Sequence, residues 1–445
     1  MPRNLRSFVV LFFLSVLFTS TYIAAAFWPV RQSLAVGEVL RISESVPDFL
    51  RDHLVLTTDD SYPGFGNCIS LLDEVKVAAP GRFQARLAIH GVIPIRTIVF
   101  DVQPVLRVYP GGQAVGVLLH TQGVIVVGYA EVVHKGGTKS SPAAEAGLMV
   151  GDIIVSIDGK PAANDQVVKE AVLRAGGKGR PVFLEVERRG KTIRFKVRPA
   201  LCRRSESYRI GLLIRDSAAG VGTLTFYEPA TRTYGALGHV ITDVTTNNPV
   251  ELAEGSIIEA FIQGIRPGQK GKPGEKLGII SQASTLSGTI QHNTEYGIFG
   301  RLDRIPQHPF YKKPIPVALA HQVRPGPATI LTVVKGSRME QFQIEIVRTN
   351  PLSRGGKKDI IINVTDRRLL RSAGGIIQGM SGSPIIQSGR LVGAVTHVYI
   401  SNPQKGYGIF AERMLRECNL LSLKNKPEVF LGDIGYYSTK ACCKI

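Results

Sequence analysis

Cysteine, tryptophan and acidic side chains are scarce in this chain of 445 residues. It has one tryptophan, five cysteines, and 35 Asp and Glu residues against 54 Lys and Arg residues. The cysteines are too few and too unevenly spaced for a disulfide framework or a zinc cluster. We therefore expect no metal and no other cofactor. The cysteines are Cys68, Cys202, Cys418, Cys442 and Cys443.

The formal net charge is +19, but the sequence has no basic motif interleaved with aromatic residues. We therefore do not expect nucleic acid to be a partner. The Gly/Lys-rich loop at residues 266–274 is not a phosphate loop, because Pro273 stands where a Ser or Thr would bind magnesium. The length suggests two to four domains, and 44% hydrophobic residues are ample for packed cores.

The N-terminus predicts a membrane anchor. Arg3 and Arg6 precede an uncharged apolar run at residues 8–28, long enough to span the hydrocarbon core of about 30 Å. Residues 1–28 are thus expected to comprise a cytosolic N-terminus and a single transmembrane helix, with the bulk of the chain outside the cytoplasmic membrane. A signal-peptidase site at residues 24–26, giving a secreted protein, is the alternative.

Residues 29–103 show strand-like alternation at 83–89 and 95–102. They predict a small β-sandwich, or a stalk, without catalytic spacing. Residues 426–445 form a C-terminal tail to which we assign no role.

Residues 104–200 resemble a PDZ domain of the bacterial type. The segment SPAAEAGLMVGDIIVSIDG at 141–159 combines a short helix, a Gly-Asp turn, a core strand and a tight turn in the order that this fold needs. Residues 165–175 predict a helix with an apolar face. In PDZ domains a peptide adds as a strand beside an apolar-Gly-apolar loop, and Val115, Gly116 and Val117 fit that pattern. The alternative is that both valines belong to an ordinary core.

Residues 201–425 carry a candidate nucleophile, Ser381, in the segment GMSGSP at 379–384. The flanking glycines allow unusual backbone angles, and the amides of Gly379 and Ser381 could form an oxyanion hole. The segment resembles the Gly-Asp-Ser-Gly-Gly-Pro signature of chymotrypsin-like serine peptidases, which implies a double β-barrel. A glycine-rich hairpin turn without chemistry is the alternative.

The candidate general base is His239, flanked by glycine at the end of an apolar strand. His397 is the competitor. By resemblance to chymotrypsin-like enzymes, its strand pairs with the substrate backbone, so Thr396, His397 and Val398 are interpreted as the wall of the substrate pocket.

The third member of a catalytic triad is the least defined. Asp366 closes the apolar run at 360–364 and obeys the order His, Asp, Ser of chymotrypsin-like chains. Asp243, four residues after His239, is the alternative. The neighbouring Arg367 and Arg368 could instead hold Asp366 in a surface ion pair.

Most of the chain resembles the stage IV sporulation protein B peptidase family of spore-forming Firmicutes. The resemblance implies that Ser381, His239 and Asp366 are the catalytic residues. It also implies that the protein acts in the space between forespore and mother cell, cleaving itself and a regulatory membrane protein so that a pro-sigma factor is processed. The matching segments are VYPGGQ at 108–113, IRDSAAG at 214–220, FYEP at 226–229, GALGHVITD at 235–243 and GGIIQGMSGSP at 374–384.

Together these patterns predict a mainly β protein with a transmembrane helix, a small β-sandwich, a PDZ domain and a double-barrel serine endopeptidase. Two other functions stay open. One is a non-catalytic adaptor, whose PDZ domain binds peptide termini or segments while the peptidase domain is a relic. The other is a general envelope quality-control protease, which would cleave unfolded proteins broadly.

Overall fold

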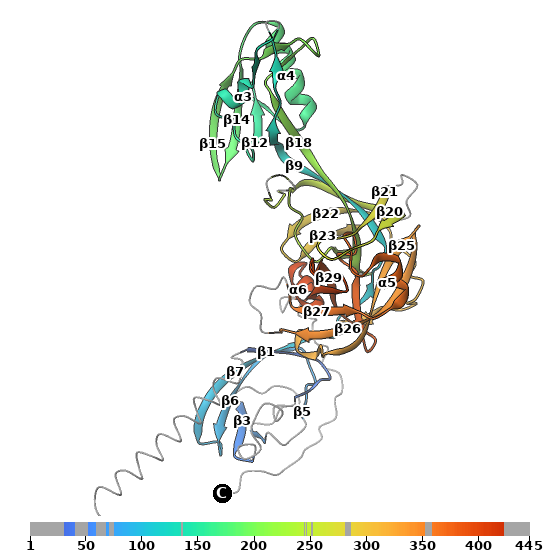
Figure 1. Cartoon of the computed structure of the whole chain (residues 1–445). Helices are drawn as coiled ribbons and strands as arrows, with labels where there is room; N and C mark the ends of the chain where they lie inside the picture. The colour runs from blue at the N-terminus through green and yellow to red at the C-terminus, as the bar shows by residue number, and fades with distance from the viewer. Residues whose placement is uncertain are drawn as a thin grey trace, which may run out of the picture. The chain divides into compact units, whose positions relative to one another are not determined.

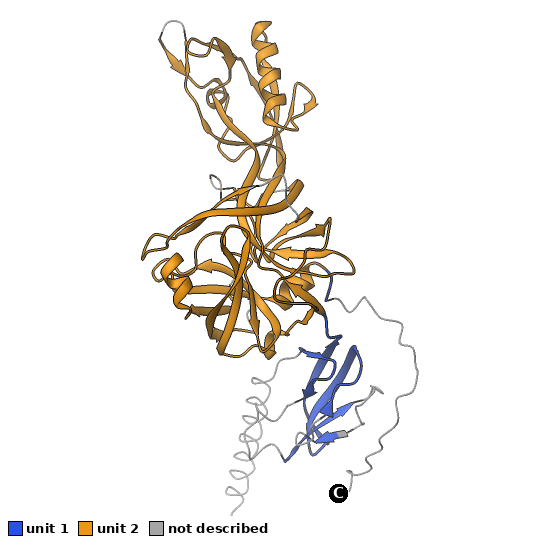
Figure 2. Cartoon of the chain, turned by 90° about the vertical axis from the view of Figure 1, so that its right-hand side faces the viewer, with its two compact units in different colours: residues 1–106, 419–445 blue, residues 107–418 orange. Residues whose placement is uncertain are grey.

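The computed structural model describes residues 31–40, 52–58, 68–70, 75–134, 137–243, 245, 247–250, 252–280, 286–351 and 358–421. The chain divides into two compact units, residues 1–106 with 419–445 and residues 107–418 (Figure 2). The predicted membrane anchor at 1–28 and the tail at 426–445 lie outside the described residues. Within those residues, no helix combines the length and the apolarity needed to cross a bilayer.

The first unit is a five-stranded sheet with the order β1-β7-β6-β3-β4, accompanied by a β2–β5 ladder. Its strands alternate as the sequence predicts: in β6, Phe83, Ala85 and Leu87 are buried and the residues between them are exposed. The strand bounds are β1 Arg31–Ala35, β2 Val39–Leu40, β3 Leu54–Thr58, β4 Cys68–Ser70, β5 Val75–Lys76, β6 Gly81–Ile89 and β7 Ile93–Gln103.

The second unit begins with β8 (Arg107–Pro110) and carries the PDZ fold around helix α4 (Asp165–Gly177). Asn164 caps this helix by accepting a hydrogen bond from the Val167 amide, and one face of the helix packs into the PDZ core. The other PDZ elements are β10 Val132–Val133, β11 Lys139–Ser140, α3 Pro142–Glu145, β12 Ile153–Ile157, β13 Lys160–Pro161, β14 Val182–Arg188, β15 Lys191–Val197, β16 Ala200–Cys202 and β17 Ser207–Arg209.

Two long strands, β9 (Ala114–Tyr129) and β18 (Leu212–Tyr227), run from the PDZ sheet into a β-barrel (Figure 1). The C-terminal part of β9 pairs with β12 of the PDZ sheet, and its N-terminal part pairs with β20 of the barrel. Strand β18 pairs with β9 along most of its length. The peptidase barrel therefore takes a strand from each side of the PDZ fold in the sequence.

This first barrel closes in the order β9-β20-β22-β23-β19-β18. Its apolar core includes Val115, Leu119, Ile257 and Ile298. The remaining strands of this part are β19 Thr233–Ala236, β20 Leu252–Arg266, β21 Glu275–Ile280, β22 Ser287–Thr294, β23 Gly297–Leu302 and β24 Ile315–Pro316.

The second barrel closes in the order β25-β26-β27-β30-β29-β28 around a core that includes Ile330, Phe342, Ile362 and Phe410. The predicted mainly β fold with a PDZ domain is thus confirmed. The elements are η2 Ala320–Gln322, β25 Gly326–Lys335, β26 Arg338–Thr349, β27 Ile360–Val364, α5 Arg367–Ala373, β28 Pro384–Gln387, β29 Arg390–Val398, β30 Lys405–Phe410 and α6 Ala411–Glu417.

Candidate active site

Ser381 lies in the tight turn between α5 and β28, flanked by two glycines with left-handed backbone angles. The φ angles are +89° at Gly379 and +93° at Gly382. A Cβ atom at Gly382 would collide with the carbonyl oxygen of Thr223 in β18. The glycines are therefore required both by the turn itself and by its close approach to the first barrel.

Two hydrogen bonds fix the direction of the backbone amides in this turn. The Lys276 amide donates to the Gln378 carbonyl at 2.9 Å, and the Ser383 amide donates to the Met380 carbonyl at 2.9 Å. Because the C=O and N–H groups of a peptide unit point in opposite directions, the amides of Gly379 and Ser381 point away from these contacts. Within the described residues neither amide has a hydrogen-bond acceptor.

The loop with His239 follows β19 and packs directly on the serine turn. A Cβ atom at Gly238 would lie 3.0 Å from Thr396 Cγ2, and one at Gly382 would lie 2.5 Å from the Leu237 amide nitrogen. The His239 and His397 rings are 5.0 Å apart between centroids. The structure thus brings His239, His397, Thr396 and the turn of Ser381 together where the two barrels meet.

His239 has the protonation state that a general base needs. Burial lowers the pKa of its imidazole, so the ring is neutral at pH 7. Its Nδ1 lies 2.8 Å from the Val240 carbonyl oxygen. A carbonyl only accepts hydrogen bonds, so Nδ1 carries the proton and Nε2 has a lone pair available.

The Ser381 hydroxyl donates to the Thr396 carbonyl oxygen at 2.6 Å. A hydroxyl has a single proton, so in this structure it is not donated to His239. Rotation about the Cα–Cβ bond of Ser381 would be needed to redirect it, and catalytic hydrogen bonds often tighten only when substrate is bound.

Asp366 is the N-cap of α5, and its contacts match the ion pair that the sequence left open. Its carboxylate accepts hydrogen bonds from the Gln343 amide and from the backbone and guanidinium of Arg368. The hydrogen bonds from Arg368 are the main cause that lowers the pKa of Asp366 to about 2. In this structure the hydrogen-bond partner of His239 Nδ1 is the Val240 carbonyl oxygen, and not Asp366.

The alternative carboxylate, Asp243, is buried and lies 3.4 Å from the Arg215 guanidinium of β18. It also accepts a hydrogen bond from the Thr245 amide. The contact with Arg215 connects the segment after His239 to the long strand β18, and the hydrogen bond from Thr245 closes a local turn.

The predicted pocket wall lies at the end of β29. Thr396 is buried, Val398 is half-buried and His397 is exposed beside His239. The segment pairs with β30 through His397 and Val398.

The predicted peptide-binding residues Val115, Gly116 and Val117 lie inside the first barrel. They pair with β18 on one edge and with β20 on the other, and both valines are buried. A peptide strand needs a free edge. The pairing conflicts with the prediction and matches the alternative of ordinary core valines.

A second apolar-Gly-apolar sequence, Ile210, Gly211 and Leu212, stands at the start of β18. This strand pairs with β9 on one edge, and within the described residues no strand pairs with its other edge from Leu212 to Ala219. Helix α4 is tied to this stretch by a hydrogen bond from the Asp165 amide to the Asp216 carboxylate. The apolar-Gly-apolar pattern occurs at residues 115–117 and again at residues 210–212, so the pattern alone does not say which of the two borders an open strand edge.

Three further residues that support the site were not predicted from the sequence. Asn293 holds the segment after His239, accepting from the Ile241 amide at 2.8 Å and donating to the Ile241 carbonyl. The Thr223 hydroxyl donates to the Gly379 carbonyl of the serine turn, and the Lys276 side chain lies next to Gly379. Nothing in the sequence marks them, because their roles depend on pairings between distant strands.

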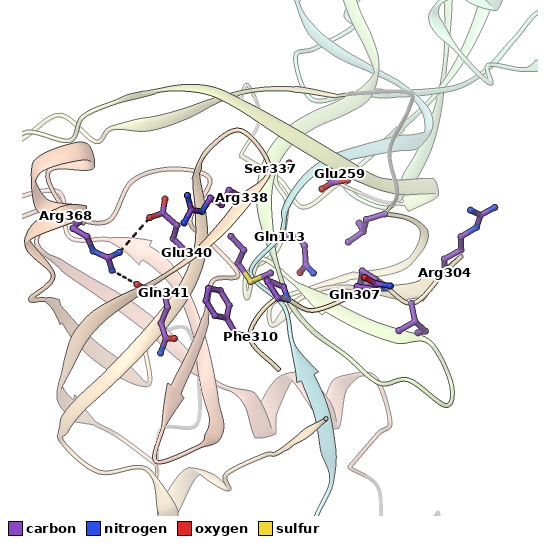
Figure 3. Close-up of a pocket in the computed structure, with 15 residues that line it drawn as sticks. Gln113, Glu259, Arg304, Gln307, Phe310, Ser337, Arg338, Glu340, Gln341 and Arg368 are labelled. Carbon is purple, nitrogen blue, oxygen red and sulfur yellow. Dashed lines mark hydrogen bonds and ion pairs between the residues drawn. The ribbon is translucent and has the colours of Figure 1, made fainter. Parts of the chain in front are cut away.

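A cavity of about 960 Å³ lies on another part of this unit, lined by residues from loops of the first barrel and from β26 (Figure 3). Arg368 reaches its rim and contacts Glu340 and Gln341. None of Ser381, His239 and Thr396 lines it. Among the described residues, no group of three or more His, Cys, Asp or Glu side chains could hold a metal ion.

Comparisons with known proteins agree with this architecture. Residues 206–415 match the family model "SpoIVB peptidase S55", and residues 115–198 match the PDZ domain model. No curated protein matches the chain.

Among solved structures, the active form of the Rv3671c protease from M. tuberculosis is 14% identical. The similarity covers 45% of this chain and 72% of that chain, with a TM-score of 0.26. The inactive form of that protease is 14% identical over 36% of this chain and 83% of that chain, with a TM-score of 0.22. On the family models, the part of the chain at residues 206–415 is assigned to the SpoIVB peptidase S55 family, and the part at residues 115–198 is a PDZ domain.

Proposed function

We propose that this protein is an endopeptidase in which Ser381 is the nucleophile and His239 the general base. One observation carries the proposal. A glycine-bounded serine with two oriented amides packs against the loop of a neutral histidine whose Nε2 has a lone pair. Nucleophile, base and oxyanion donors in one place are what acyl transfer requires.

In the proposed reaction, the Ser381 hydroxyl turns from Thr396 to His239 and transfers its proton to Nε2 as Oγ attacks the scissile carbonyl. The amides of Gly379 and Ser381 stabilise the negative charge that develops on the carbonyl oxygen. His239 then gives the proton to the leaving amine, and an acyl-enzyme remains on Ser381. Water, deprotonated by His239, hydrolyses the ester and restores the serine.

The third position of the triad has two candidates. The family resemblance implies Asp366, which would have to exchange its hydrogen bonds with Arg368 for one with His239 Nδ1. The Val240 carbonyl already holds Nδ1 in the required tautomer. We propose the triad with Asp366 for the substrate-bound enzyme, and a Ser-His dyad oriented by Val240 is the competing mechanism.

We further propose, on the family resemblance, that the chain cleaves itself and a regulatory membrane protein in a sporulation pathway that leads to pro-sigma factor processing. It would act outside the cytoplasmic membrane, anchored by residues 1–28. The open edge of β18 beside α4 suits strand addition by a substrate peptide, with the apolar-Gly-apolar residues 210–212 at its start.

Self-cleavage tests the proposal. The full-length protein in detergent micelles should lose self-cleavage and peptide hydrolysis when Ser381 is replaced by Ala. Ser383→Ala is the matched control, because Ser383 is buried in the same turn and its Oγ has no hydrogen-bond partner among the described residues. Activity that survives in Ser381→Ala would favour the non-catalytic adaptor, with cleavage due to a contaminant.

A further inference from the structure

A lysine is buried under the serine turn, and the mechanism above does not use it. Lys276 of β21 is 5% exposed. In the part of the chain that the structure describes, its ammonium contacts hydroxyl groups and no carboxylate lies within ion-pair distance. Burial lowers the pKa of Lys276 to about 7. A buried amine without a carboxylate partner lowers the stability of the fold, and such groups are concentrated at functional sites.

The backbone and stem of Lys276 support the turn directly. Its amide donates to the Gln378 carbonyl, and the Gln378 amide donates to the Gly274 carbonyl at 2.8 Å. The stem lies beneath Gly379, where an added Cβ would be 3.1 Å from Lys276 Cβ and Cδ. Lys276 therefore borders the peptide unit that presents the Gly379 amide.

The ammonium reaches the same turn through a threonine. Lys276 Nζ donates to Thr332 Oγ1 at 2.7 Å and lies 3.4 Å from Thr223 Oγ1. Thr223 Oγ1 donates to the Gly379 carbonyl at 2.8 Å, and the Thr223 amide donates to the Ser381 carbonyl at 2.9 Å. Both threonines are fully buried. Thr223 and Thr332 come from β18 and β25, so the amine joins the two barrels at the turn.

We propose that Lys276 is a positioning residue for the oxyanion hole. It holds the peptide units on both sides of Gly379 so that the Gly379 amide faces the oxygen of the substrate. Its amine contacts the hydroxyl of Thr223, which donates to the Gly379 carbonyl, so the amine helps to fix the orientation of Gly379 and of its amide. Preorganised dipoles of this kind stabilise the charge that develops in the transition state more than they stabilise bound substrate. This inference rests on the proposed role of Ser381.

The test replaces Lys276 by Met, which keeps the stem and removes the amine. We expect kcat to fall by about ten- to a hundredfold, somewhat less than the 10² to 10³ lost with an oxyanion donor itself. KM for a peptide substrate should stay within about twofold, since ground-state binding is unaffected. Affinity for a peptide boronate, whose adduct mimics the tetrahedral intermediate, should fall in parallel with kcat/KM. The melting temperature should stay equal or rise, because a buried unpaired amine is gone.

Two further variants keep the test decisive. Lys405→Met removes an exposed lysine of the second barrel and should leave all four quantities unchanged. If Lys276→Met fails to fold, Thr223→Val takes its place in the test. It removes only the hydroxyl that contacts the Gly379 carbonyl, and it should lower kcat without changing KM.

Wild-type kcat in the Lys276→Met variant would overturn the inference. So would a fall in kcat that comes with a lower melting temperature and an equal loss of product-peptide binding, because a merely structural role gives that pattern. If Ser381→Ala abolishes cleavage while Lys276→Met is normal, only this inference fails. If Ser381→Ala is active, the proposed function fails with it.

Discussion

The two barrels of the peptidase region are built in opposite ways. The second barrel uses strands that all lie between β25 and β30, and it closes on itself. The first barrel depends on β9 and β18, which also form part of the PDZ sheet. The proposed nucleophile therefore lies on the self-contained barrel, and the proposed base follows a strand of the barrel that is continuous with the PDZ fold.

This difference indicates how a peptide on the PDZ part could influence the site. Strand β18 carries Arg215, which contacts Asp243 after His239, and Thr223, which contacts the serine turn. A change in β18 would therefore affect both sides of the active site. Among the described residues, the strands of the second barrel do not pair with the PDZ sheet. The predictions below test this division, from the largest expected effect to the smallest.

The first prediction asks whether a residue of the second barrel orients the histidine of the first. Asp366→Asn should lower turnover by about four orders of magnitude if Asp366 holds the His239 tautomer during catalysis. The fold should survive, because Asn is also a good N-cap for α5. Turnover of a fluorogenic peptide and circular dichroism check both points.

The matched control is Asp243→Asn, which should lower turnover far less, because the Asn amide oxygen can still accept the hydrogen bond from the Thr245 amide. Near-normal turnover of Asp366→Asn would assign the orienting role to the Val240 carbonyl. The enzyme would then be a Ser-His dyad.

The second prediction concerns the contact between the serine turn and the first barrel. Gly382→Ala should lower turnover by about a hundredfold or more, because its Cβ would collide with Thr223 O and displace Ser381. Gly389→Ala, at a similar φ of +72° with nothing within 4 Å, should cost only about 1 kcal/mol of stability and leave turnover intact. Equal losses of turnover in both variants would show that the close approach to β18 is unimportant.

The third prediction tests the open edge of β18. Leu213 is 51% exposed there, and Leu213→Glu should weaken cleavage of the protein substrate by about tenfold while a short unspecific peptide is cleaved normally. Phe183→Glu is the control, since Phe183 is similarly exposed but lies in β14, which is paired on both edges. If the two variants behave alike, substrates do not bind along β18.

The smallest expected effect is on the pH profile. Because burial lowers the pKa of His239 from its ordinary value of 6.5, the base stays unprotonated to lower pH. The acidic limb of kcat/KM should therefore have its midpoint below pH 6.5, and activity should be lost only as the pH falls through that midpoint. A midpoint above pH 6.5 would contradict a neutral His239 in the free enzyme at pH 7.

Local patterns predicted much of the fold. Alternation in β6, the apolar run of β27 and the helix-turn-strand order of the PDZ fold each follow from residues close in sequence. The glycine-bounded Ser381 and the glycine-flanked His239 were found in the same way. Periodicity does not say which strands pair, so it could not show that residues 115–117 enter the barrel or that residues 210–212 begin the open-edged strand.

The parts of the site that depend on strand pairing could not be predicted from the sequence. Lys276 reads as an ordinary strand lysine, and only its pairing with Gln378 places it beneath Gly379. Asp366 stood at the end of an apolar run, and the choice between triad member and partner of Arg368 depends on side-chain geometry.

Covalent labelling tests the central claim most directly. A fluorophosphonate reacts with a serine hydroxyl only where a base and an oxyanion hole activate it, so the full-length protein in micelles would be labelled, digested and sequenced by mass spectrometry. We predict one labelled site, Ser381, with the label lost in Ser381→Ala and kept in Ser383→Ala. Labelling at Ser383, or a protein that stays unlabelled while folded, would contradict the assignment of Ser381 as the activated nucleophile.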